Sequence, residues 1–334
     1  MGRKSGSLFA LVLCGCSQAL DPLIELELRD LSSDTLLEDG DLHVIMGGTG
    51  TLSTDADRVG ASVAVVAGGR VLVFDTGPGS TRVLGSSGTP LRAISDVFIT
   101  HLHSDHYGDL GELTVASEIM GRSAPITVHG PPGIERVAEG FTMAYAPDHA
   151  NRSAQHPGHL HTDNARLRPS VLPVLSEPLV VLDADGVTVT AFPVNHAPVE
   201  PAYGFRVSYG GRSVVVSGDT AYHEPLALYA RDADVLIHEA MDKDFAEQIA
   251  RISDRIGEER TGALIRDALP NHSTPRDAGR IAQAAGADKL VLTHISPPLI
   301  TIPIQRRFTR QARSVFDGEV LLAHDGMRID IETR

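Results

Sequence analysis

A cluster of metal-binding residue types at the end of a buried strand constrains this chain more than any other feature of its sequence. An apolar segment at 95–100, expected to be a buried strand, leads directly into His101, His103, Asp105 and His106. With fifteen histidines in 334 residues, this spacing arises by chance in about two chains per thousand. Neutral imidazole and carboxylate are ligands of Zn²⁺, and also of Mn²⁺ or Fe²⁺. The pattern therefore predicts a metal site in a strand-to-helix loop.

Strand and helix patterns alternate along most of the chain. Strands are expected at 43–46, 62–67, 70–75, 95–100, 126–129, 187–194, 203–209, 212–217, 234–238 and 289–293, with two short ones inside 321–331. Helices are expected at 108–120, 131–144 and 274–285. Two runs of β-hairpins, each followed by α/β units, predict an α/β fold in which two sheets pack together with helices outside them.

Three segments are expected along the chain. Residues 1–20 resemble a bacterial targeting segment, because a basic start precedes a short apolar run and a lipobox-like sequence that would carry a lipid on Cys16. This favours an exported lipoprotein of the periplasm or outer membrane, anchored through Cys16, whereas a plain apolar N-terminus would leave the protein in the cytoplasm. Residues 21–41 are expected to be an acidic tether. Residues 42–334 are expected to form one domain with an excursion at about 145–178.

Four further motifs, each at the end of an expected strand, complete a pattern with the histidine cluster. They contain Asp75 in Phe-Asp-Thr-Gly-Pro-Gly, His196 in Val-Asn-His, Asp219 in Ser-Gly-Asp-Thr and His294 in Thr-His-Ile-Ser. Taken in order, these motifs resemble those of the metallo-β-lactamase superfamily, over roughly 42–331. The resemblance implies an αββα sandwich of two mixed β-sheets flanked by helices, with a metal-dependent hydrolytic site at one rim.

The resemblance also implies a role for each motif residue. One metal would be held by His101, His103 and His196, a second by Asp105, His106 and His294, and Asp219 would bridge the two, with Asp75 bracing the metal loop. Two divalent cations, Zn²⁺ first and Mn²⁺ or Fe²⁺ as alternatives, would lower the pKa of a shared water and supply a hydroxide nucleophile at ordinary pH. Asp105 would also orient that water or accept its proton.

Three segments further along resemble the ribonuclease Z and arylsulfatase-like branch of that superfamily. They are Ala-Tyr-Gly-Phe-Arg at 202–206, Ile-His-Glu-Ala at 237–240 and His-Ser-Thr at 272–274. The resemblance implies that His272 is a general acid that protonates the leaving oxygen, and a cap on the following helix is the structural alternative. His238 and Glu239 would orient metal ligands through hydrogen bonds, or else form a buried polar pair at a strand end.

The overall charge argues against a nucleic-acid partner. The chain carries 29 basic and 43 acidic residues, a formal net charge of −14, and affinity for nucleic acid comes largely from Lys and Arg. Within 139–168 three arginines are offset by three acidic residues, so this excursion offers no basic patch. Segment 166–178 also lacks the lysine of the loop with which ribonuclease Z grips tRNA. We therefore expect a small-molecule substrate.

The leading functional expectation is a dinuclear metal-dependent hydrolase acting on a small ester, of the phosphodiester, aryl sulfate or lactone class. Two enzymatic alternatives are a β-lactam hydrolase and a ribonuclease Z-like phosphodiesterase acting on tRNA precursors. A non-catalytic binding protein on the same fold is a third, although degenerate members of such a family usually lose metal ligands and all seven are present here. A homodimer is a further expectation.

Overall fold

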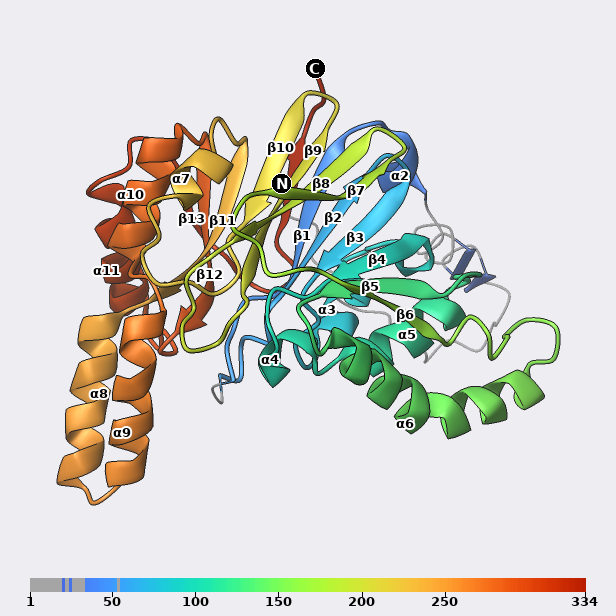
Figure 1. Cartoon of the computed structure of the whole chain (residues 1–334), viewed down its shortest axis with the longest axis horizontal. Coiled ribbons are helices and arrows are strands. Elements are labelled where there is room, and N and C mark those ends of the chain that lie inside the picture. Colours follow the sequence, from blue (N-terminus) through green and yellow to red (C-terminus); the bar gives the residue numbers. More distant parts are fainter. Residues whose placement is uncertain (1–19, 22–23, 26–33, 53–54) are drawn as a thin grey trace.

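The computed structural model of the chain describes residues 20–21, 24–25, 34–52 and 55–334. The expected targeting segment with Cys16 lies outside the described residues, apart from Leu20, and so does part of the expected tether, residues 22–23 and 26–33. Across the part of the chain that is described, helices that combine the length and apolar character needed to cross a bilayer are absent. Figure 1 shows two β-sheets that meet face to face, each with helices on its outer side.

Each sheet has seven strands, and the sequence is divided almost in half between them. The first sheet has the order β14 (Arg328–Ile331), β1 (Leu42–Gly48), β2 (Ser62–Ala67), β3 (Arg70–Phe74), β4 (Ile94–Phe98), β5 (Ile126–Gly130) and β6 (Leu167–Val171). The second has the order β13 (Glu319–Leu322), β12 (Lys289–Ser296), β11 (Val235–Met241), β10 (Arg212–Val216), β9 (Tyr203–Tyr209), β8 (Val187–Pro193) and β7 (Leu179–Ala184).

Both sheets are mixed, with antiparallel hairpins at one side and parallel crossovers at the other. Strands β3 to β6 are parallel neighbours in the first sheet, and β10 to β13 are parallel neighbours in the second. Parallel strands place their carboxyl ends at one edge, so the loops that follow them gather there. This topology confirms the predicted sandwich of two mixed sheets.

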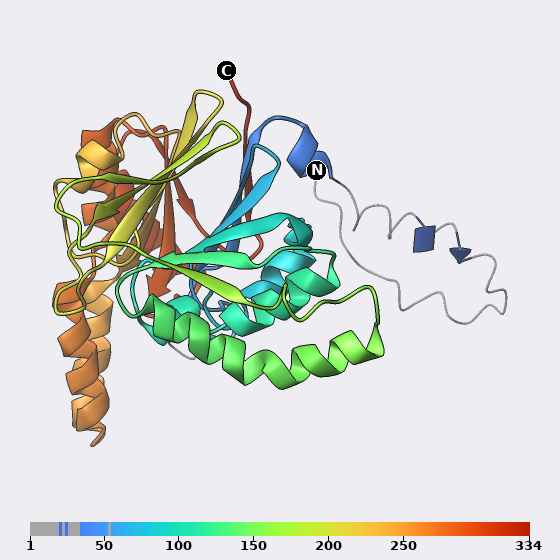
Figure 2. The ribbon, with the colours of Figure 1, turned by 45° about the vertical axis from the view of Figure 1, so that its right-hand side comes forward.

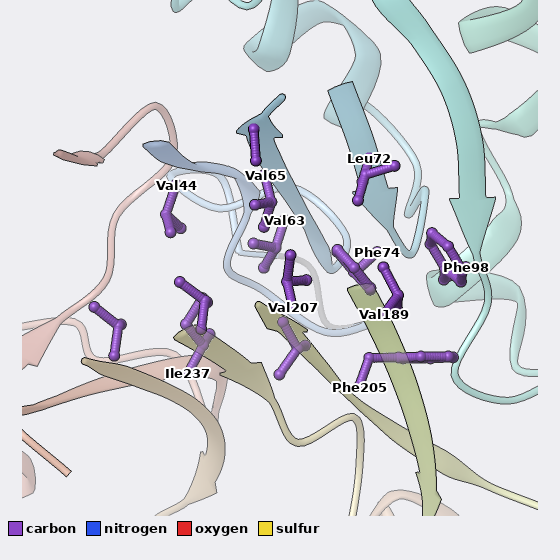
Figure 3. Close-up of a cluster of buried hydrophobic side chains, with 14 of the residues drawn as sticks. Val44, Val63, Val65, Leu72, Phe74, Phe98, Val189, Phe205, Val207 and Ile237 are labelled. Atoms are coloured by element: carbon purple, nitrogen blue, oxygen red, sulfur yellow. The ribbon is translucent and has the colours of Figure 1, made fainter. Parts of the chain in front are cut away.

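The apolar core between the sheets follows from the two-residue period of the strands. In β2, Val63 and Val65 face the opposite sheet, whereas Ala64 and Val66 face the helices outside. Aromatic rings fill the inner layer near the strand ends, where Phe74 stacks on Phe98 with ring centroids 5.0 Å apart. Figure 3 shows these rings beside Phe205 of β9. The strand ends that carry the site residues are thus held by tight packing.

Helices cover the outer face of each sheet. Over the first sheet lie the short α2 (Thr35–Glu38), α3 (Ser80–Ser86), α4 (Ser104–Tyr107), α5 (Leu110–Ile119) and α6 (Ile134–Gln155). Over the second lie α7 (Leu226–Tyr229), α10 (Pro275–Ala285) and α11 (Ile302–Arg313). Two short 3-10 turns lie at Leu91–Ala93 and Leu269–Asn271. The pair α8 (Lys243–Arg255) and α9 (Glu259–Ala268) projects from the body as a helical hairpin (Figures 1 and 2).

Some local expectations differ from the structure. The helix expected to end at Ala144 continues as α6 to Gln155, with Pro147 inside it. Proline removes one helical hydrogen bond, but the last turns are held by the buried imidazole of His149, whose Nδ1 lies 3.3 Å from the Glu118 carboxylate of α5. The segment at 145–178 therefore contains regular structure, including β6 at the edge of the first sheet.

Candidate metal centre

Strand ends from both sheets bring the candidate residues together. His101 follows β4, His196 follows β8, Asp219 follows β10, and His294 lies near the end of β12. Asp105 and His106 belong to α4, which begins directly after His103. Residues separated by nearly two hundred positions in the sequence thus meet at one edge of the sandwich, near α4 in Figure 1.

Side-chain donors in this region form overlapping groups that could hold metal ions. In each group the possible ligand atoms all lie within 4.8 Å of one another. One group contains His101, His103 and His196, and a second contains Asp105, His106 and His294. Asp219 forms a third group with His101 and His106, which joins the first two. The arrangement matches two adjacent three-donor sites that share one carboxylate.

The Asp219 carboxylate lies at the centre of this arrangement. Its Oδ2 is 3.3 Å from His106 Nε2, 3.4 Å from His294 Nε2 and 3.9 Å from His101 Nε2. Burial alone would raise the pKa of Asp219, but the neighbouring imidazoles His294 and His106 outweigh it and hold the pKa well below its usual range. Asp219 is therefore an anion at neutral pH, as a carboxylate shared between two cations must be.

Several imidazole nitrogens in the centre are buried without a hydrogen-bond partner. They are Nε2 of His106, Nε2 of His196, and both ring nitrogens of His294. Leaving a buried polar atom unpaired costs free energy, so such atoms are uncommon in folded proteins. Divalent cations would supply a partner to the Nε2 atoms, and the donor set of imidazole and carboxylate suits zinc. The residues present fit the divalent metal ions that this fold implies.

Hydrogen bonds at Nδ1 orient the rings of His196 and His101, and the Nε2 of His101 also lies 2.9 Å from His103 Nδ1 inside the centre. His196 Nδ1 donates to the carbonyl oxygen of Asn271 at 3.0 Å, and His101 Nδ1 lies 3.0 Å from the Thr100 hydroxyl. Both bonds leave Nε2 to face the centre. Burial lowers the pKa of His101 well below its usual value and lowers that of His196. Both rings are therefore neutral, the form that binds a metal.

The carboxylate of Asp75 braces the histidine loop from behind. It accepts hydrogen bonds from the Thr100 amide at 2.8 Å, from the Thr100 hydroxyl at 2.9 Å and from His106 Nδ1 at 2.7 Å. Burial opposes protonation of His106, but Asp219 and Asp75 outweigh it and raise the pKa of this imidazole well above its usual value.

Both Asp75 and His294 have left-handed backbone conformations, with φ of 59° and 48°. Such conformations in non-glycine residues concentrate at functional sites.

A second carboxylate, Glu239, connects His272 to the centre. Its Oε1 accepts from His272 Nδ1, from the amide of Ser273 and from the amide of Thr220, each at 3.1 Å. Burial opposes protonation of His272, but the Glu239 carboxylate outweighs it and raises the pKa of His272 to about 9. His272 therefore carries a proton at neutral pH and can donate it from Nε2.

The remaining candidates have structural contacts. His238 lies on β11 with its Nδ1 donating to the backbone carbonyl of Glu239 at 2.7 Å, so it supports the strand end and is not brought into the metal cluster. The cap of α10 is Thr274, whose hydroxyl accepts from the Asp277 amide at 3.1 Å in a capping box. The capping role that the sequence left open for His272 therefore belongs to Thr274.

A cleft of about 270 Å³ opens beside these groups. It is lined by Thr51, Leu52, His103, Ser104, Asp105, Asp219, Met241, Ala268, His272, His294 and Ser296. The imidazole of His272 and the carboxylate of Asp105 thus share one cavity with Asp219. Leu52, which is 73% exposed, lies at its mouth. A substrate in this cleft would meet both the proton donor His272 and the imidazole and carboxylate groups that could hold metal ions.

Comparison with known proteins agrees with this fold and site. Residues 70–295 match the model of the beta-lactamase superfamily domain, and the chain belongs to the metallo-β-lactamase superfamily, in its ribonuclease Z-like branch. It is 31% identical over 301 residues to ribonuclease Z of Mycobacterium bovis, a match that covers 88% of this chain and 99% of that protein. It is 33% identical over 293 residues to ribonuclease Z of Mycobacterium sp. (strain KMS), covering 87% and 96%.

A solved structure also supports the similarity to ribonuclease Z. The short form of human tRNase Z superposes with a TM-score of 0.59 at 26% identity, covering 86% of this chain and 99% of that one. These relatives favour the ribonuclease Z-like alternative over the small ester that the sequence had placed first. The enzyme is a metal-dependent hydrolase.

Two expectations are overturned by the same relatives. The prediction that nucleic acid is an unsuitable partner is wrong, because the matched relatives are named as enzymes of RNA and tRNA. The net charge of −14 describes the whole surface and does not exclude a local basic patch. The predicted export as a lipoprotein anchored through Cys16 is also wrong, because an exported protein would be separated from the RNA on which ribonucleases act.

Sequence reasoning missed several residues that support the centre. Thr100 joins Asp75 to His101, and the Asn271 carbonyl orients His196. Ser273 Oγ donates to the Thr220 carbonyl at 2.7 Å and so ties the His-Ser-Thr segment to the loop of Asp219. Thr100 could have been suspected from its position immediately before His101. A backbone carbonyl carries no signal in the sequence.

Proposed function

We propose that this protein is a ribonuclease Z-like phosphodiesterase that hydrolyses a phosphodiester bond of tRNA precursors with the help of two divalent metal ions. The observation that carries the proposal is the joining of two three-donor groups by Asp219, next to a protonated His272 in one cleft. Similarity to ribonuclease Z along nearly the whole length of those relatives supports the substrate class.

We assign the metal ligands from the donor groups. His101, His103 and His196 would hold one ion, Asp105, His106 and His294 the other, and Asp219 both, with zinc as the favoured metal because imidazole and carboxylate dominate the set. When bound, the two cations would supply an activated water at neutral pH and stabilise the negative charge that develops on the phosphoryl oxygens.

The side chains of this chain would carry out the remaining steps. Burial opposes ionisation of Asp105, but the neighbouring imidazoles of His294, at 3.6 Å, and His106 outweigh it and lower the pKa of Asp105 to about 2. It is therefore ionised and can accept a hydrogen bond from an attacking water. His272, oriented by Glu239 through a 3.1 Å hydrogen bond, would give its proton to the leaving oxygen of the ribose. General acid catalysis of this kind contributes about 10²- to 10⁴-fold in rate.

The test is incubation of the purified protein with a tRNA precursor that carries a 3′ extension. We expect cleavage that stops on chelation and returns when zinc is added. The variant His103→Ala should lose the activity while the exposed-surface variant Arg82→Gln keeps it. Hydrolysis of small aryl esters without any cleavage of the precursor would overturn the RNA substrate. Cleavage by His103→Ala at the wild-type rate would overturn the assigned centre.

A further inference from the structure

Helix α11 has an unusual charge for this acidic chain. Its sequence, Ile302–Arg313, contains four arginines and no acidic residue, whereas the chain as a whole carries a net charge of −14. All four side chains, Arg306, Arg307, Arg310 and Arg313, are exposed. The sequence between the last metal-binding motif and the C-terminus thus contains a local concentration of positive charge.

The arginines lie on the side of α11 that faces away from the protein. Phe308, Thr309 and Ala312 are buried, and the Ala312 backbone packs so closely on α10 that a Cβ at Gly279 would lie 2.8 Å from its carbonyl oxygen. Figure 1 shows α10 and α11 side by side over the second sheet. The i, i+4, i+7 spacing of Arg306, Arg310 and Arg313 places them in one stripe about 10 Å long.

Internal ion pairs do not account for this stripe. Among the residues that the structure describes, neither Arg306 nor Arg310 has a carboxylate within ion-pair distance. Arg313 donates to the backbone carbonyl of Val320 at 3.0 Å. Two guanidinium groups therefore present all their donors to solvent, which is the state that suits recognition of an external anion.

Helix α11 is linked through Arg307, the neighbour of Arg306, to the wall of the catalytic cleft. Arg307 Nη2 is 2.5 Å from the carboxylate of Asp242, the residue that follows Met241 in the cleft wall. The Asp242 amide in turn donates to the carbonyl of Ser296 at 2.8 Å, and Ser296 also lines the cleft. These contacts join the turn of α11 that carries Arg306 and Arg307 to the wall of the cleft.

We propose that the arginine stripe of α11, formed by Arg306, Arg310 and Arg313, is a docking surface for the phosphate backbone of the RNA substrate. This inference rests on the proposed function. Arginine forms bidentate hydrogen bonds with phosphate oxygens, and such contacts position a nucleic acid without reading its sequence. The stripe supplies the basic patch that the net charge of the chain conceals.

The test compares two double variants with the same change in charge. R306Q/R310Q removes the two arginines of the stripe that lack internal partners, and the control R82Q/R231Q removes two exposed arginines outside α11. For each zinc-loaded protein, kcat/KM on a tRNA precursor is measured over a range of KCl concentrations. Hydrolysis of bis(p-nitrophenyl) phosphate, which is too small to reach the stripe, reports on the catalytic centre alone.

We expect R306Q/R310Q to lower kcat/KM on the precursor at low salt and to reduce the slope of log(kcat/KM) against log[KCl] by about 1 to 2. Its hydrolysis of the small diester should match that of the wild type, and R82Q/R231Q should match the wild type on both substrates. Equal slopes for the two double variants would overturn the docking surface alone. A wild-type protein that hydrolyses the small diester but not the precursor would overturn the RNA function and this surface together.

Discussion

Removal of the Asp75 carboxylate should lower both the stability of the fold and the affinity of the centre for zinc. This side chain is 4% exposed and accepts three hydrogen bonds, two from Thr100 and one from His106. Asp75→Ala removes the shared acceptor of all three donors in the interior, and leaves His106 Nδ1 only a long 3.4 Å contact with the Thr100 hydroxyl. Breaking a buried charged pair in this way costs about 3–5 kcal/mol, which corresponds to a fall in Tm of about 5–8 °C for a chain of this length. Because His106 also loses its orientation, zinc affinity should fall by about 10- to 100-fold.

A matched control exists on the neighbouring strand. Asp96 of β4 is 6% exposed and pairs with His129, whose Nε2 lies 2.9 Å from its carboxylate, but this pair does not belong to the metal cluster. Asp96→Ala should therefore destabilise the protein and leave zinc affinity unchanged. Thermal unfolding of the metal-free proteins measures the first effect, and competition with a chromogenic chelator measures the second. Equal zinc affinity in Asp75→Ala and the wild type would refute the bracing role.

Three further predictions concern His272 and helix α10, which follows it. His272→Asn should lower kcat on a tRNA precursor by about 10²- to 10⁴-fold, and should leave hydrolysis of bis(p-nitrophenyl) phosphate nearly unchanged because nitrophenolate leaves without a proton. The pKa of His272 is raised to about 9, and bound cations would lower it. Because the proton is lost as pH rises through this pKa, kcat/KM on the precursor should fall at or below pH 9. His272→Asn should not show this fall. Thr274→Ala removes the α10 cap and should cost about 1 kcal/mol in chemical denaturation, with little change in kcat.

The sequence, through its strand pattern together with its resemblance to the metallo-β-lactamase superfamily, was sufficient to predict the sandwich and the residues of the candidate centre. Buried strands that end in His, Asp or Gly are visible because strand periodicity and metal-binding residue types both leave local signals. His101, His196, Asp219 and His294 each follow such a signal, and the structure brings them together. The order of these motifs carried the information that no single one of them contains.

Features that depend on tertiary contacts were not predictable in the same way. The helical hairpin of α8 and α9 was missed, and Figure 1 shows it standing away from the body. Its helices have a clear helical spacing of apolar and charged residues, a local signal that the sequence analysis overlooked, but their projection from the body, with mainly small residues such as Ala246, Ala250 and Gly262 buried, has no such signal. The extension of α6 past Pro147 depends on a buried pair between His149 and Glu118, two residues that are 31 positions apart.

The error about nucleic acid has a physical cause as well. A net charge averages over the surface, whereas binding depends on the local field. Segment 139–168 is electrically balanced, whereas the arginines of α11 lie at 306–313. Counting charge helix by helix would have found them.

Titration of zinc into chelated protein, followed by the rate of cleavage of a 3′-extended tRNA precursor, tests the central claim most directly. A two-ion phosphodiesterase should be inactive without metal and should reach its full rate at about two zinc ions per chain. Full cleavage in the absence of metal, or no cleavage at any zinc concentration, would contradict it.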